Sequence, residues 1–138
     1  MTILYDSEKA LVSELRNHVR ELWGEHAHSK VEVPCHDQAR MDVLVQTPTC
    51  LIAVEAKLSN WNRVVAQAYL HRYCADLVYI AVLENMITQD RLDEAGRFAI
   101  GVISVANGST RIMRTAVQGH PNMRIRERIA STSILSSS

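Results

Sequence analysis

Residues 40–57 read RMDVLVQTPTCLIAVEAK, and this stretch decides the fold that the sequence predicts. Two apolar runs, 39–46 and 50–55, lie on either side of Pro48, which marks a turn because proline cannot donate a hydrogen bond within a sheet. The second run is almost continuously apolar, as is typical of a central strand that is buried on both faces. We therefore predict two neighbouring strands joined by a tight turn.

Three charged side chains interrupt these strands, at Asp42, Glu55 and Lys57. Side chains alternate in direction along a strand, so Glu55 and Lys57 point to one face while Ala56 points away. Two adjacent carboxylates repel each other unless a proton or a cation lies between them. Asp42, Glu55 and the carbonyl of Ala56 offer oxygen ligands of the kind that Mg²⁺ takes. Lys57 could orient or deprotonate a water, or stabilise developing negative charge.

The rest of the chain predicts an α/β fold with a mixed central sheet flanked by helices. Apolar residues recur at helical spacing in two segments, and β-branched or alternating runs mark four further strands. The expected helices are 7–24 and about 60–74, residues 88–96 are expected to form a short polar helix or turn, and the further strands are 30–34, 77–83, 100–105 and 111–117. The dipeptide Asn107-Gly108 predicts a hairpin turn between the last two strands.

This arrangement resembles the PD-(D/E)xK nuclease superfamily, which includes restriction endonucleases, Holliday-junction resolvases and RecB-like nucleases. The matching residues are Asp42, twelve intervening residues, and then Glu55-Ala56-Lys57, followed by a helix. The resemblance implies a restriction-endonuclease-like αβββαβ core within residues 1–120. It also implies an Mg²⁺- or Mn²⁺-dependent endonuclease that hydrolyses phosphodiester bonds in DNA.

The same resemblance implies that two helices contribute to the site. Several branches of the superfamily carry a glutamine on the helix after the motif, and Gln67 occupies that place here, with Tyr69 and Tyr73 beyond it. A glutamate on the first helix often joins the metal ligands. Glu14 is the first candidate for that role, and Glu8 is the second.

Charge is distributed unevenly along the chain, although its formal net charge is zero. Residues 1–96 contain nine Lys/Arg and fourteen Asp/Glu, whereas residues 97–138 contain six arginines and one glutamate. An acidic body beside a basic segment suits a protein that holds a cation and a polyanion, and a solvated basic tail is the alternative. The predicted DNA contacts are Arg40, Arg111, Arg114, Arg124 and Arg126. Residues 121–138 are expected to form an Arg-containing extension that is frayed from residue 131.

Cysteine usage favours reduced thiols in a cytoplasmic protein, because Cys35, Cys50 and Cys74 are odd in number and form no CxxC pair. No apolar run approaches the roughly 18 residues that span a bilayer, and the first residues lack the pattern of a secretory signal. A loose histidine and cysteine set leaves a zinc site open as an alternative. Its members are His26, His28, Cys35 and His36.

A second functional hypothesis remains beside the nuclease. The same fold could serve as a non-catalytic module that binds nucleic acid or a partner protein. Cutting both strands of a duplex would call for two active sites, so the nuclease hypothesis also predicts a homodimer.

Overall fold

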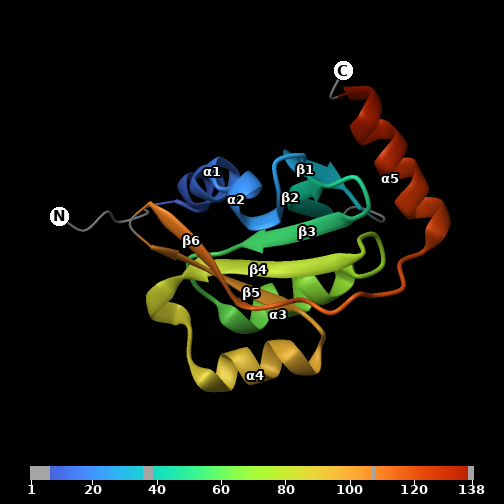
Figure 1. Cartoon of the computed structure of the whole chain (residues 1–138). Helices are drawn as coiled ribbons and strands as arrows, with labels where there is room; N and C mark the ends of the chain where they lie inside the picture. Colours follow the sequence, from blue (N-terminus) through green and yellow to red (C-terminus); the bar gives the residue numbers. More distant parts are fainter. Residues whose placement is uncertain (1–6, 36–38, 107, 137–138) are drawn as a thin grey trace.

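A six-stranded mixed sheet forms the centre of the molecule, with helices on both of its faces (Figure 1). The computed structural model describes residues 7–35, 39–106 and 108–136. In chain order the elements are α1 (Glu8–Asn17), α2 (Val19–Trp23), β1 (His28–Pro34), β2 (Arg40–Gln46), β3 (Leu51–Ala56), α3 (Trp61–His71), β4 (Leu77–Leu83), η1 (Glu84–Met86), α4 (Gln89–Arg97), β5 (Gly101–Ala106), β6 (Ser109–Arg114) and α5 (Met123–Ser136).

The strands lie in the sheet in their chain order, from β1 to β6. The three central strands β3, β4 and β5 run parallel, and every other neighbouring pair is antiparallel. Parallel neighbours need a crossover, which α3 provides between β3 and β4, and α4 between β4 and β5. The predicted α/β fold with a mixed sheet is therefore confirmed.

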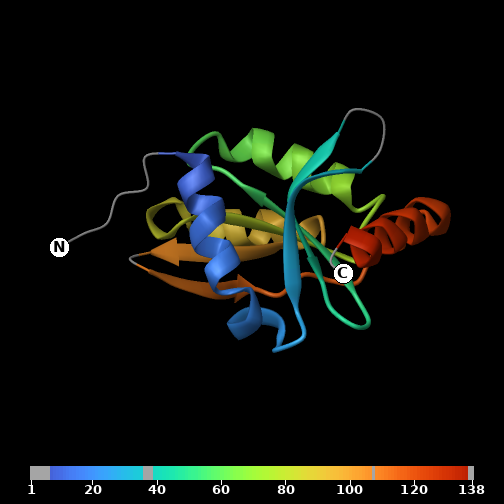
Figure 2. The same cartoon turned by 90° about the horizontal axis from the view of Figure 1, so that it is seen from above.

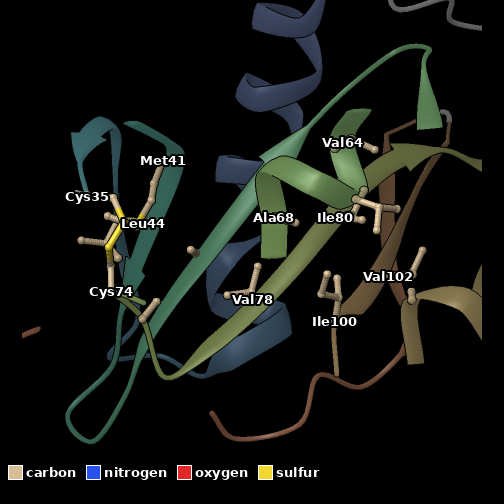
Figure 3. Close-up of a cluster of buried hydrophobic side chains, with 14 of the residues drawn as sticks. Cys35, Met41, Leu44, Val64, Ala68, Cys74, Val78, Ile80, Ile100 and Val102 are labelled. Carbon is tan, nitrogen blue, oxygen red and sulfur yellow. A yellow bond between two sulfur atoms is a disulfide. The ribbon is translucent and has the colours of Figure 1, made fainter. Parts of the chain in front are cut away.

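Hydrophobic side chains fill both faces of the sheet. Leu11 and Leu15 of α1 pack on one face, while Val64 and Ala68 of α3 pack on the other. Figure 3 shows part of the second layer, in which α3 lies over the central strands. Because both faces are covered, all six residues of β3 are buried, as its continuous apolar pattern predicted.

The C-terminal segment differs from the prediction, because the chain does not fray from residue 131 but is helical through Ser136. Ile129 of α5 is 5% exposed and joins the layer that α3 covers. Arg126 Nε and Nη2 donate to the two carboxylate oxygens of Asp76 at 2.7 and 2.8 Å, and the Leu51 N–H donates to the same carboxylate at 2.8 Å. Apolar contacts of Ile129, Ile125 and Ala130 and a bidentate ion pair thus hold α5, whose place beside the sheet is seen in Figure 2.

The cysteines also differ from the prediction of reduced thiols, because Cys35 and Cys74 form a disulfide across a Cα–Cα distance of 5.8 Å. The bond joins Cys35, the residue after β1, to Cys74, three residues beyond the end of α3, and it lies beside Met41 and Leu44 of β2 (Figure 3). The two residues are 39 positions apart, so their spacing in the sequence carried no sign that they meet. Cys50 is a free thiol.

Smaller differences concern the ends of elements. The predicted helix 7–24 is interrupted at His18, whose φ of −114° and ψ of 10° separate α1 from α2. The last strand begins and ends earlier than residues 111–117, since β6 spans Ser109–Arg114. The described helices include none that has both the length and the apolar character needed to cross a membrane.

Candidate active site

The antiparallel pairing of β2 with β3 brings Asp42 and Glu55 together. Val43 pairs with Val54, so one step further along this register Asp42 faces Glu55. The backbone N–H of Asp42 donates to Glu55 Oε1 at 3.4 Å, and the N–H of Ala56 donates to Asp42 Oδ2 at 3.0 Å. Glu55 is 3% exposed, so this carboxylate lies in the protein interior. The predicted meeting of the two acids is therefore what the structure shows.

Their proximity changes the acidity of Asp42. Burial and the neighbouring charge of Glu55 raise the pKa of Asp42 from 3.8 to about 7, against the opposing effects of the Ala56 N–H and of Lys57. A carboxyl group with such a pKa holds a proton at slightly acidic pH. A bound cation would satisfy the same pair of oxygens without that proton, which is the electrostatic character that a metal ligand pair needs.

His71 completes the buried side of the site, and the sequence analysis missed it. Its Nε2 lies in a very short contact with Glu55 Oε1, and the residue is 3% exposed. The buried residues of α3 include Val64, Ala68 and His71, and His71 follows Val64 by seven residues. That spacing of i, i+4 and i+7 was the signal in the sequence that could have found it.

Gln67 lies one helical turn before His71, on the same side of α3. Within the described part of the chain, Gln67 Oε1 and His71 Nδ1 are both buried without a hydrogen-bond partner. Buried polar atoms are rarely left unpaired in a folded protein, so each calls for a water, an ion or a ligand group. The structure thus places the predicted Gln67 on the helix that carries His71, with an acceptor oxygen still to be satisfied.

Lys57 lies just beyond the end of β3, where its backbone N–H donates to the Ala81 carbonyl at 3.2 Å. Its Nζ lies 3.4 Å from Glu8 Oε1, which identifies Glu8 as the glutamate of α1 that reaches this group. Glu14, the first candidate, lies elsewhere, since its carboxylate is 3.5 Å from His18 Nδ1. Of the two glutamates, Glu8 is thus the one that contacts Lys57, and a metal-ligand role for Glu14 or Glu8 stays a prediction. The role of the Ala56 carbonyl stays a prediction.

The five arginines that were predicted to contact DNA differ in their surroundings, because some pair within the protein and others are exposed. Arg126 is committed to its bidentate pair with Asp76 and is corrected from a phosphate contact to a structural residue. The guanidinium of Arg114 occupies the space that a Cβ on Gly96 would take. Arg40 is exposed and donates to the Glu32 carbonyl at 3.1 Å. Two further members of the predicted set are exposed, Arg111 and Arg124.

The zinc alternative loses one of its ligands, because Cys35 is bonded to Cys74. His26 has a side chain that is 75% exposed and lies 3.4 Å from Glu25, and His36 lies outside the described residues. The described ranges hold no group of three or more His, Cys, Asp or Glu side chains arranged to hold a metal. Asp42 and Glu55 still fit Mg²⁺, since this ion commonly takes one or two carboxylates and keeps several waters.

No protein-family model matches the chain, and no curated protein matches it. Two solved structures share its fold. A protein of unknown function from Silicibacter pomeroyi has a TM-score of 0.69 at 19% identity, over 92% of this chain and 83% of that one. Pyrococcus furiosus SfsA, solved in complex with Ca²⁺, has a TM-score of 0.50 at 13% identity, over 88% of this chain and 68% of that one. At these identities the likeness concerns the fold alone.

Proposed function

We propose that this protein is a Mg²⁺- or Mn²⁺-dependent nuclease of the PD-(D/E)xK type that hydrolyses phosphodiester bonds in DNA. The observation that carries the proposal is the carboxylate pair of Asp42 and Glu55, with Lys57 close enough to lower the pKa of Asp42. The fold that the chain shares with Ca²⁺-bound SfsA supports it further, because Ca²⁺ and Mg²⁺ both take oxygen ligands.

Each residue has a chemical role in this proposal. Asp42 and Glu55 would hold the divalent ion, which when bound supplies an acidified water and neutralises charge on the phosphate. His71 fixes the orientation of Glu55 through its short contact, as the outer partners of metal ligands commonly do. Lys57, steadied by Glu8 at 3.4 Å, stabilises the negative charge that develops on the phosphate oxygens.

The test is cleavage of supercoiled and branched DNA with Mn²⁺, for the wild type and for the Asp42→Asn and Lys57→Ala variants. Removing one electrostatic stabiliser of a transition state typically lowers the rate by about 10²–10³-fold, and we expect that loss for Lys57→Ala. Lys9→Ala is the matched control, because Lys9 is exposed on α1 beside Glu8. Equal cleavage by the wild type and the Lys57→Ala variant would show that Lys57 takes no part in the reaction and would reject the proposed active site.

One contact favours a second candidate function. Because His71 already holds one oxygen of Glu55, the pair could be satisfied without a metal. The domain would then be a non-catalytic DNA-binding module of the same fold. DNA binding that is equal in EDTA and Mn²⁺, with no cleavage of any of these DNA substrates, would support this function instead.

A further inference from the structure

The exposed aromatic side chains of the described residues gather at one place. Trp61 and Tyr79 are buried, whereas Tyr69 is 49% exposed, Tyr73 is 45% exposed and Phe98 is 39% exposed. Tyr69 lies in the last turn of α3 and Tyr73 lies two residues beyond its end, and the rings of Tyr69 and Phe98 meet edge to face with centroids 5.6 Å apart. Exposed rings are uncommon enough that a contiguous group marks a surface for interaction.

Cationic and planar side chains accompany these rings. The guanidinium of Arg72 lies 6.0 Å from the centre of the Tyr69 ring. Tyr69, Arg72, Tyr73 and His120 line a hollow of about 780 Å³, beside the apolar side chain of Leu70. We call these four residues and Phe98 the aromatic surface. In Figure 2, α3 forms the border of the molecule, and no described element covers its outer side.

The residues of α3 and those flanking it in the sequence carry only positive charge, in contrast to the rest of the N-terminal two thirds of the chain. Glu94 of α4 contacts Trp61 at the opposite end of the helix from Tyr69. Residues 57–75 contain Lys57, Arg63 and Arg72 and neither aspartate nor glutamate, although residues 1–96 as a whole are acidic. Stretches of the chain that carry cations but no carboxylates attract polyanions. An uncharged apolar partner would not need this excess of lysine and arginine over aspartate and glutamate, so the charge pattern favours a nucleic acid.

We propose that the aromatic surface binds single-stranded DNA, with unpaired bases stacking on Tyr69 and Tyr73 and the backbone phosphates contacting Arg72. Aromatic rings combined with arginine form the usual platform for single strands, because every base offers a flat face once it is unpaired. In a duplex the bases stack on one another, so their faces cannot reach exposed rings. The surface therefore selects strands with unpaired bases.

The aromatic surface lies near the carboxylate pair, so a bound single strand could reach the candidate active site. This link between binding and cleavage rests on the proposed nuclease function. Ala39 also lines the hollow and precedes Asp42 by three residues, which corresponds to about 10 Å along a strand. The other side of α3 carries His71, which contacts Glu55. A strand held on the aromatic surface would thus lie close to the candidate active site.

The experiment measures the anisotropy of a fluorescein-labelled 15-residue oligothymidylate in EDTA, for the wild type and its variants. We expect Tyr69→Ala and Tyr73→Ala each to weaken binding by roughly 5- to 150-fold, because stacking accounts for that much per base. Tyr69→Phe keeps the ring and should bind within about twofold of the wild type. Leu70→Ala is the matched control for the ring, since Leu70 is 62% exposed and lines the same hollow but is not aromatic, and it should weaken binding much less than Tyr69→Ala.

Three results would overturn the inference. These are a wild type that does not bind the oligothymidylate, alanine variants that bind it as tightly as the wild type, and a Leu70→Ala variant that loses as much affinity as Tyr69→Ala. The last result would identify an apolar surface for a protein partner. A single cooperative urea transition for each variant would show that it folds, and Tyr69→Phe, which keeps the ring that meets Phe98, controls for any loss of stability.

The same variants separate this inference from the proposed nuclease function. Binding in EDTA needs no metal and no intact carboxylate pair, whereas cleavage in Mn²⁺ depends on Lys57. Ring-dependent binding without cleavage by any variant would uphold the aromatic surface and reject the nuclease. Cleavage that depends on Lys57, with binding that is indifferent to Tyr69 and Tyr73, would do the reverse.

Discussion

Replacing Asp42 by asparagine should stabilise the metal-free protein at alkaline pH. The substitution keeps the size of the side chain and an oxygen that can accept from the Ala56 N–H, but it removes one charge beside buried Glu55. Burial and Glu55 raise the pKa of Asp42 from 3.8 to about 7, so the folded state favours the protonated form. The contribution of this group to stability is complete below pH 3.8 and is lost as the pH rises through about 7.

The magnitude follows from the same shift in pKa. A difference of this size corresponds to about 4 kcal/mol at most, since each pKa unit is worth about 1.4 kcal/mol. Asp42 is partly exposed, and solvent screening reduces the energy of such groups. We therefore expect Asp42→Asn to exceed the wild type by about 1–2 kcal/mol in its free energy of unfolding at pH 8, and to be equal to it or less stable at pH 4.

The assay is urea denaturation in EDTA at several values between pH 4 and pH 8.5, followed by tryptophan fluorescence. Asp93→Asn is the matched control, because Asp93 is exposed on α4 and should not reproduce the pH dependence. Adding Mg²⁺ should reverse the order at pH 8, because an ion at one hundred times its dissociation constant stabilises the wild type by about 2.7 kcal/mol. An Asp42→Asn variant that is less stable than the wild type at pH 8 in EDTA would refute the reasoning.

Two further predictions concern the Arg126–Asp76 ion pair and the Cys35–Cys74 disulfide. Arg126→Met should lower the free energy of unfolding by about 3 kcal/mol, because it leaves the buried carboxylate of Asp76 without its ion-pair partner. Arg124→Met is the control, because Arg124 is exposed on α5. In the same urea titration it should change the free energy of unfolding by less than about 0.5 kcal/mol. Reducing the Cys35–Cys74 disulfide should cost about 4 kcal/mol, since it closes a loop of 39 positions, and unchanged urea midpoints with and without dithiothreitol would contradict this.

The carboxylate pair was predictable because only a short connection separates its two strands. Pro48 marked the turn, and the Thr47 N–H does donate to the Cys50 carbonyl at 3.0 Å within it. A tight hairpin leaves little freedom in register, and the alternating side chains then decide which residues share a face. Asp42 and Glu55 could thus be paired from thirteen positions of sequence alone.

His71 was harder to predict, because the helical spacing that points to it does not by itself decide the end of the buried stripe. Its burial depends on how α3 is rotated about its axis and where the helix crosses the sheet, and these are set by packing across the whole layer. A helical stripe read from the sequence leaves an uncertainty of one position at its end. Here the difference between His71 and Arg72 decides whether the partner of Glu55 is an imidazole or a guanidinium.

The sequence by itself determined the elements whose signals are local: the sheet strands, the hairpin that joins Asp42 to Glu55, and the amphipathic helices. Only the tertiary structure decided which distant groups meet. Arg126 pairs with Asp76 across fifty positions, Cys35 bonds to Cys74 across 39, and the ring of Tyr69 on α3 meets Phe98 on the surface. The physical reason is that hydrogen-bonding patterns and side-chain alternation act over a few residues, whereas these contacts depend on the packing of complete layers.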